Sequence, residues 1–318
     1  MWRLNKKLFS TSKKLFDKSV IAKNDKFVRI LNDNKNNSEI TVYIKGFLTR
    51  GENPENFKVW RNSHLQLCKS NHHWKANALG YFWQTGYSKT PVDYIIQKIP
   101  EKIRPDSSPY HKPTKTQIPF LTLSATTISL ALKIFLKTRM LHPLGLVVAF
   151  GSDTALIIAQ LLSQYHRARK NAEEHAPMLV KNLLELRKQY PNRKIRVVAH
   201  SLGCKLVIKA IENHEINLID ELHLLAPGIT VNEFNKMMTA HQNMTPVKNI
   251  FIYHSSEDYM FELFSIVEGD HGLGYLGLLE PLPSNVYQKD VTRFLQDSYN
   301  KHKEYANKFP DFAFKNET

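Results

Sequence analysis

The sequence predicts an α/β fold, in which helices cover both faces of a mostly parallel central sheet. Short runs of β-branched and aromatic residues recur along the chain, and most are bounded by turn residues. Amphipathic segments with helical spacing lie between several of these runs. Strands that alternate with helices are typical of parallel sheets, because parallel neighbours need a crossover connection. A length of 318 residues fits one such domain with additions.

The elements follow one another in the order that this fold requires. The predicted strands are 39–47, 77–86, 195–201, 220–228 and 247–255, with a further short strand after residue 284. A long amphipathic helix is predicted over 166–190, with Pro177 marking a kink or an entry point. A second helix is predicted directly after the strand 195–201.

The predicted domain, 31–318, contains an insertion at about 91–165. Five prolines between 91 and 116 indicate an irregular connection, and two apolar blocks follow at 116–132 and 141–162. A membrane span needs about 20 predominantly apolar residues. The blocks are therefore compatible with buried or interfacial helices and with a membrane hairpin, and residues 119–162 are a candidate surface for a membrane or a membrane protein.

The first 30 residues form a basic amphipathic arm. Its start, "MWRLNKKLFSTSKKLF", holds five basic residues and no acidic one, with leucines on one helical arc and lysines on the other. This pattern predicts a mitochondrial presequence. The alternative is a cytoplasmic protein whose amino-terminal arm lies on a membrane surface or on a partner protein.

Composition narrows the classes of partner and cofactor. The chain has 44 basic and 29 acidic residues, for a net charge of +15, so its surface should attract anions such as acidic lipids. It has no zinc-finger spacing and no RNA-binding aromatic signature, so we expect no nucleic-acid partner. The two cysteines, Cys68 and Cys204, give neither a disulfide framework nor a metal site. We expect no metal and no organic cofactor.

One pentapeptide has the pattern of a nucleophile elbow. Ala199-His200-Ser201-Leu202-Gly203 follows a predicted strand and precedes a predicted helix. In such an elbow the serine lies on a sharp strand-to-helix turn, and small neighbours are needed because the backbone is closely packed. Alanine replaces the usual first glycine of GxSxG and is small enough for the same place. Ser201 is the candidate nucleophile.

An acid and a base should follow this serine in that order, on loops after later strands. Asp258 follows the predicted strand 247–255, and His302 follows the last short strand. Glu257 is a competing acid, and His271 in a glycine-rich loop is a competing base. His254 lies nearer the strand than the loop, and His200 is expected to point away from the nucleophile.

Two backbone N–H groups are candidates for stabilising an oxyanion. One belongs to Leu202, the residue after the nucleophile. The other belongs to Phe47, because Gly46 permits a tight turn after the strand 39–47.

Several stretches, in order from residue 42 to about 306, resemble the α/β-hydrolase superfamily of serine lipases and esterases. More narrowly, they resemble the hydrolase domain of transmembrane and coiled-coil domain-containing proteins. They are "VYIKGFL", "ALGYFWQTG", "VVAHSLGCKLV", "LHLLAPG", "IYHSSEDYM", "GLGYLGLLEP" and "NVYQKDVT...HKEY". The resemblance implies an α/β-hydrolase fold with Ser201 as nucleophile, Asp258 as acid and His302 as base. Ala199 and Tyr259 depart from the residues commoner in the family.

Two hypotheses for the function follow. In the first, the protein is a serine hydrolase that cleaves a carboxylic ester of a lipid or another hydrophobic acyl compound. In the second, a hydrolase fold serves as a non-catalytic subunit of a mitochondrial membrane-associated complex, since a fold alone does not determine a function.

Overall fold

The computed structural model describes most of the predicted domain outside its insertion. The described residues are 27–31, 38–47, 54–70, 74–83, 152–212, 218–241, 247–258, 260, 261, 264, 268, 270, 272–296 and 301–314, with the backbone alone for 152–164. Residues 1–26 of the presequence candidate (1–30) and the part of the insertion before residue 152 lie outside them.

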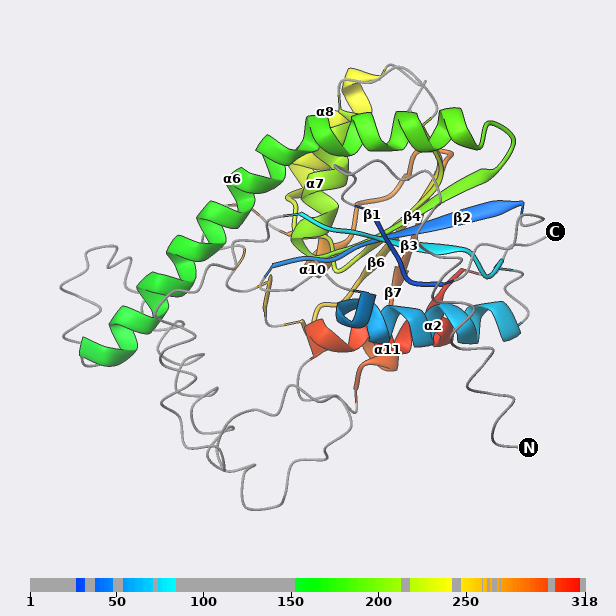
Figure 1. The fold of residues 1–318 in the computed structure, drawn as a ribbon. Coiled ribbons are helices and arrows are strands. Elements are labelled where there is room, and N and C mark those ends of the chain that lie inside the picture. The colour runs from blue at the N-terminus through cyan, green and yellow to red at the C-terminus, as the bar shows by residue number, and fades with distance from the viewer. Residues whose placement is uncertain are drawn as a thin grey trace, which may run out of the picture.

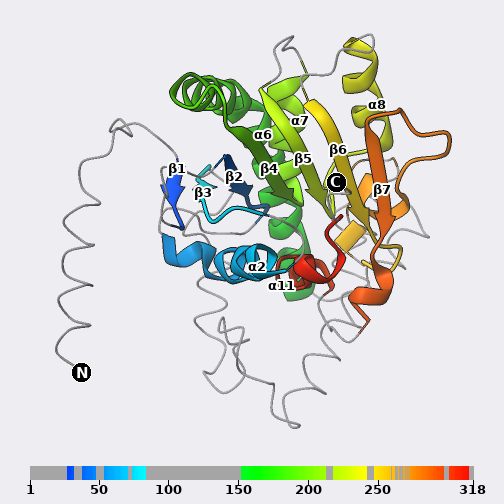
Figure 2. The same cartoon turned by 90° about the vertical axis from the view of Figure 1, so that its right-hand side faces the viewer.

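In this part of the chain, seven strands form one sheet in the order β1-β3-β2-β4-β5-β6-β7 (Figures 1 and 2). Only β1 is antiparallel to its neighbour, β3, and every other neighbouring pair of these strands is parallel. The strands are β1 (Phe27–Arg29), β2 (Glu39–Ile44), β3 (Ala78–Tyr81), β4 (Lys194–His200), β5 (Ile219–Leu225), β6 (Val247–His254) and β7 (Val286–Asp290). The predicted fold class is confirmed.

Helices cover both faces of the sheet. On one face lie α6 (Ser152–Gln189), α7 (Leu202–Ile211) and α8 (Val231–Ala240), and on the other lie α2 (Lys58–Lys69) and α11 (Lys301–Phe312) (Figures 1 and 2). Shorter elements are η2 (Pro54–Phe57), α10 (Leu273–Leu276) and η3 (Thr292–Phe294). Burying both faces explains why the central strands read as nearly continuous apolar runs.

The order of the strands creates a switch point between β2 and β4. The chain passes from β2 to β3 on one side and later enters β4 on the other side of β2, where Ile44 pairs with Ala199. The loops that follow β2 and β4 therefore start next to each other. In open α/β sheets, ligands bind outside the carboxyl ends of the strands at such a point.

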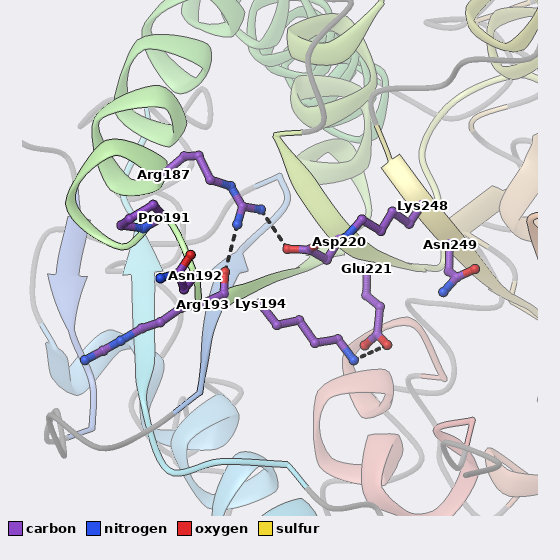
Figure 3. Close-up of a pocket in the computed structure, with 9 residues that line it drawn as sticks. All are labelled: Arg187, Pro191, Asn192, Arg193, Lys194, Asp220, Glu221, Lys248 and Asn249. Carbon is purple, nitrogen blue, oxygen red and sulfur yellow. Dashed lines mark hydrogen bonds and ion pairs between the residues drawn. The ribbon is translucent and has the colours of Figure 1, made fainter.

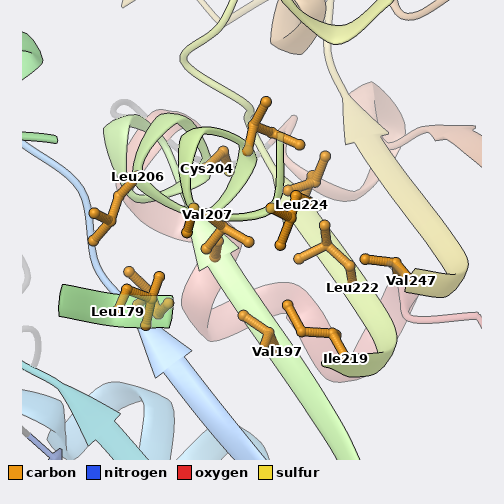
Figure 4. Packing of buried hydrophobic residues seen from close by; sticks show 14 of the residues in the cluster. Leu179, Val197, Cys204, Leu206, Val207, Ile219, Leu222, Leu224 and Val247 are labelled. Carbon is orange, nitrogen blue, oxygen red and sulfur yellow. The ribbon is translucent and has the colours of Figure 1, made fainter. Parts of the chain in front are cut away.

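The larger apolar core lies between the sheet and the helices α6, α7 and α8. Alternate residues of β4, such as Val197, point into it, and Val207 of α7 and Leu179 of α6 meet them there (Figure 4). These side chains are fully buried. Burying a side chain of this size contributes roughly 1.5–3 kcal/mol, so this core fixes α7 and the turn that precedes it.

The opposite face of β4 carries a buried arginine. Arg196 is 0% exposed and forms ion pairs of 2.7 Å with both Glu39 of β2 and Glu221 of β5. Its guanidinium carbon lies 3.9 Å from the ring centroid of Trp74. Two carboxylates and a ring thus compensate for a charge that would otherwise be costly to bury.

The long helix differs from the prediction of 166–190 in where it begins. α6 begins at Ser152, so it includes the end of the apolar block 141–162, and it continues through Pro177. The block has no glycine or proline after residue 151, and its apolar residues continue the helical spacing. The first turns of α6 extend beyond the sheet (Figure 1). None of the described helices, α6 included, meets the length and hydropathy of a membrane span.

Three further differences concern the amino-terminal part of the domain. β1 at Phe27–Arg29 lies within the segment that we assigned to the basic arm, so the sheet begins before residue 31. α2 was not predicted, and it covers the sheet beside α11. β3 ends at Tyr81, earlier than the predicted strand 77–86.

Candidate active site

Ser201 lies in a strained turn between β4 and α7. Its backbone has φ 56° and ψ −128°, a region that residues with a side chain rarely adopt. Three hydrogen bonds hold it: its N–H donates to the Leu225 carbonyl, and its own carbonyl accepts from the N–H groups of Cys204 and Gly228, each at 3.0 Å. Strain of this kind costs of order 1–3 kcal/mol and is concentrated at functional sites.

The glycines around Ser201 are needed for steric reasons. A Cβ added at Gly46 would lie 2.5 Å from the Ser201 Cβ, and one added at Gly203 would lie 2.6 Å from the Ile44 carbonyl oxygen. The end of β2, the elbow and the first turn of α7 are therefore in direct contact. At the other small position, Ala199 is fully buried in the sheet, so a methyl group fits there.

We expect Gly203→Ala to destabilise the fold by about 1–3 kcal/mol, because the carbonyl oxygens of Ile44 and Lys45, at the end of β2, must move to make room for the methyl group. Chemical denaturation measures this difference. The comparison variant is Ala210→Gly, in the last turns of the same helix. It also changes one methyl group but creates no clash. A Gly203→Ala protein as stable as the wild type would contradict the close packing described here.

The structure brings Asp258 and His302 together. Asp258 follows β6, His302 lies in the first turn of α11, and His302 Nδ1 is 2.7 Å from Asp258 Oδ2. Asp258 is 1% exposed, and its Oδ1 also accepts a hydrogen bond from the Met260 N–H at 3.2 Å. A carboxylate only accepts, so His302 carries a proton on Nδ1, and Nε2 is its basic nitrogen when the ring is neutral.

The competing acid has a different partner. Glu257 forms an ion pair with Lys301, the residue before His302. This second link joins the same two segments, the loop after β6 and the start of α11. Two other histidines were considered from the sequence. His271 lies outside the described residues, and His254 packs against Gly277 of the loop after α10.

Both candidate oxyanion residues lie next to the elbow. Leu202 is the first residue of α7, where backbone N–H groups have no acceptor within the helix. Phe47 follows Gly46, the glycine that touches Ser201. A helix amino terminus and a tight turn that face one position can stabilise negative charge on an oxygen bound there.

A series of aromatic rings runs from Phe47 to His302. Consecutive ring centroids lie 5.8 Å apart for Phe47 and Tyr165, and 6.2 Å apart for Tyr165 and Phe264. The distance is 5.7 Å both for Phe264 and Phe261 and for Phe261 and His302. We call these five residues the aromatic arc. The local sequence does not indicate its middle members, because they come from α6 and from the segment after Asp258.

His200 lies on the face of β4 that α11 covers. Its Nε2 is 2.9 Å from the carbonyl oxygen of His302, and the two ring centroids are 4.7 Å apart. We expected this side chain to point away from the nucleophile and assigned it no role, so its contact with the candidate base is a new feature of the site. Alternation along β4 places it on the same face as Arg196 and Val198.

Among the described residues, no group of three or more His, Cys, Asp or Glu side chains could hold a metal ion. Cys204 is fully buried, and burial raises the pKa of its thiol well above the usual value. It is therefore a poor nucleophile despite its closeness to Ser201.

A polar pocket lies at the opposite edge of the sheet, where β4, β5 and β6 begin (Figure 3). Five of its charged side chains pair with one another: Asp220 binds Arg187 at 2.6 Å and Lys248 at 2.7 Å, and Lys194 pairs with Glu221. The pocket is lined by Arg187, Pro191, Asn192, Arg193, Lys194, Asp220, Glu221, Lys248 and Asn249. It is separate from the elbow, which lies at the carboxyl ends of the strands.

Comparison with known proteins identifies the family. No curated protein matches this sequence. Two solved structures are similar in part: MenH from S. aureus, with 9% identity over 90% of this chain and 94% of that one (TM-score 0.36), and the siderophore hydrolase EstB from Aspergillus nidulans, with 10% identity over 93% and 96% (TM-score 0.37). The family described as "Alpha/beta hydrolase of unknown function (DUF900)" matches residues 148–307. This match covers half of the 318 residues, so the chain belongs to that family of α/β hydrolases.

Proposed function

We propose that the protein is a serine hydrolase that cleaves carboxylic esters with a hydrophobic acyl group. Its family supports hydrolase activity. The proposal that Ser201, His302 and Asp258 cleave an ester is supported above all by the 2.7 Å hydrogen bond between His302 and the buried Asp258. In the same chain, Ser201 has the strained backbone of a nucleophile elbow. Each of the three residues follows a different strand of the sheet, β4, β6 or β7, as catalytic groups on this kind of sheet do.

In the first half of the proposed reaction, Ser201 Oγ attacks the acyl carbon of the ester, and its proton passes to His302 Nε2. Asp258 keeps the imidazole oriented and stabilises its positive charge. The carbonyl oxygen becomes an oxyanion, which the N–H groups of Phe47 and Leu202 stabilise. The C–O bond to the alcohol then breaks, the alcohol leaves with the proton from His302, and Ser201 remains acylated.

In the second half, water attacks the acyl-enzyme. Its proton passes to His302 Nε2, and a second oxyanion forms in the same place. The bond to Ser201 Oγ breaks, the proton returns to that oxygen, and the carboxylic acid leaves. The cycle needs no metal and no organic cofactor.

The aromatic arc supports the preference for a hydrophobic acyl group. It connects the residue that carries one oxyanion donor, Phe47, to the base, His302, so an acyl chain on Ser201 would lie beside it. Phe47 and Tyr165 are half-buried. Transfer of each CH₂ group from water to such a surface contributes up to about 0.8 kcal/mol.

We expect kcat/KM for p-nitrophenyl esters to rise from acetate to octanoate, by up to about fourfold per CH₂ group that the arc covers. Tyr165→Ala should reduce this gain and leave the hydrolysis of the acetate nearly unchanged. Tyr287→Ala, a change to a 42% exposed tyrosine on β7, serves as the control. A kcat/KM that stays flat or falls with chain length would contradict the proposed substrate class.

We also propose that the enzyme acts at a mitochondrial membrane. The basic amphipathic arm supports import, and the apolar residues 119–162 support contact with lipid or a membrane protein. Sequencing the amino terminus of the protein purified from mitochondria tests this. An intact arm on a protein found in the cytosolic fraction would contradict it.

A further inference from the structure

His200 connects the strand of the nucleophile to the helix of the base. It is the last residue of β4 and directly precedes Ser201. Its ring centroid lies 4.7 Å from that of His302, 6.0 Å from that of Tyr305 in α11 and 6.1 Å from that of Trp60 in α2. Its imidazole is thus held between two helices.

The hydrogen bond of His200 has a defined direction. Burial, followed by the charge of His302, lowers the pKa of His200 well below the usual value, so its imidazole is neutral at neutral pH. A carbonyl oxygen can only accept, so the neutral ring must carry its proton on Nε2. His200 Nε2–H therefore donates to the His302 carbonyl at 2.9 Å.

This bond acts on the backbone of the base and not on its side chain. The side chain of His302 is fixed at one end by Asp258, and its main chain is fixed by His200. The ion pair of Lys301 with Glu257 adds a third link, but Glu257 is 48% exposed, and an exposed pair of this kind contributes little. Among these three links, the bond from His200 is the one that ties the base directly to the strand of Ser201.

We infer that His200 is a positioning residue for catalysis: its Nε2–H donates to the His302 carbonyl and sets the position of the base relative to Ser201. This inference rests on the proposed function. A displacement of about 1 Å in a catalytic group can cost about 10²-fold in rate. His200 does not touch the substrate or exchange a proton in the reaction.

The test uses three substitutions of His200 with different hydrogen-bonding abilities. His200→Phe keeps a ring of similar size but has no donor. His200→Gln keeps an N–H donor near the position of Nε2, and His200→Asn has a donor that is too short to reach. His223→Phe is the matched control, because His223 is also buried on this face of the sheet, and burial lowers its pKa to about 4.

Two quantities are measured for the full chain: the rate of Ser201 labelling by a fluorophosphonate, and the downfield proton NMR signal of His302 Nδ1–H. We expect His200→Phe and His200→Asn to slow labelling by about 10²-fold and to weaken or broaden the signal. His200→Gln should stay within about threefold of the wild type in rate and keep the signal. His223→Phe should lower the melting temperature without changing either quantity.

Three results would overturn the inference. The first is a His200→Phe protein with wild-type labelling and an unchanged signal. The second is a rate of Ser201 labelling that His200→Phe and His200→Gln reduce equally. The third is a labelling rate that His223→Phe reduces in proportion to its loss of stability; this result would mean that His200 has only a structural role. If His200→Phe does not fold, the comparison of His200→Asn with His200→Gln tests the inference. If wild-type Ser201 is not labelled at all, the proposed function fails, and the NMR signal still tests whether His200 positions His302.

Discussion

Asp258→Asn is expected to lower kcat for ester hydrolysis by about 10⁴-fold, with little change in the melting temperature. Asp258 Oδ2 accepts the proton on His302 Nδ1 at 2.7 Å and so fixes which imidazole nitrogen is basic. An asparagine can turn its NH₂ group toward that nitrogen. The neutral imidazole then carries its proton on Nε2 and cannot accept the one from Ser201. Steady-state kinetics at pH 7 with a p-nitrophenyl ester measure the effect.

Glu257→Gln is the matched control for this prediction, because it makes the same chemical change one residue away. Glu257 pairs with Lys301 and not with the imidazole, so we expect its kcat to stay within about threefold of the wild type. A large loss in Glu257→Gln together with a small one in Asp258→Asn would make Glu257 the acid and contradict the arrangement proposed here.

Arg196→Met is expected to reduce the free energy of unfolding by about 3–5 kcal/mol at pH 7. The side chains of Glu39 and Glu221 are each 7% exposed and would lose the guanidinium that lies 2.7 Å from both. Methionine fills much of the volume but leaves two buried carboxylates close together. Urea unfolding followed by circular dichroism gives the difference.

This deficit should depend on pH. Burial raises the pKa of Glu221, but His223, whose Nε2 lies 3.7 Å from its carboxylate, and the charge of Arg196 lower it by more, so in the folded protein it lies below the usual 4.5. A carboxylate with a lowered pKa stabilises the fold fully above 4.5 and loses that contribution as the pH falls. The difference between wild type and Arg196→Met should therefore narrow below about pH 4.5.

Lys194→Met is the control for Arg196→Met. Lys194 also pairs with Glu221, but its side chain is 31% exposed, and we expect its loss to cost less than about 1 kcal/mol. If Arg196→Met were as stable as Lys194→Met, the buried ion pairs would not be the link between β2, β4 and β5 that we describe.

The sequence allowed the elbow to be predicted because its signal is local. Steric crowding in a sharp strand-to-helix turn restricts the residues next to Ser201. The pentapeptide 199–203 alone therefore indicates that position 203 needs a small residue. The strands were equally readable, since burial on both faces demands apolar runs. Their mostly parallel direction followed from the alternation with helices.

The rest of the candidate site depends on contacts between distant segments. His200 and His302 are 102 residues apart, and nothing in either local sequence indicates their hydrogen bond. The aromatic arc joins Phe47 to Tyr165 and then to residues beyond 260. The start of α6 was misplaced for a different reason: a long apolar helix in a domain and an apolar membrane segment share the same composition.

The most direct test of the proposed function is reaction of the purified full chain with a fluorophosphonate, followed by peptide mass spectrometry. We predict one phosphonylated residue, Ser201, no labelling of Ser201→Ala, and no labelling of heat-denatured wild type. Ser201→Ala keeps the backbone of the elbow, so an unchanged melting temperature would show that the variant is folded. Absence of a Ser201 adduct on a folded wild-type protein would contradict the catalytic account and favour a non-catalytic subunit.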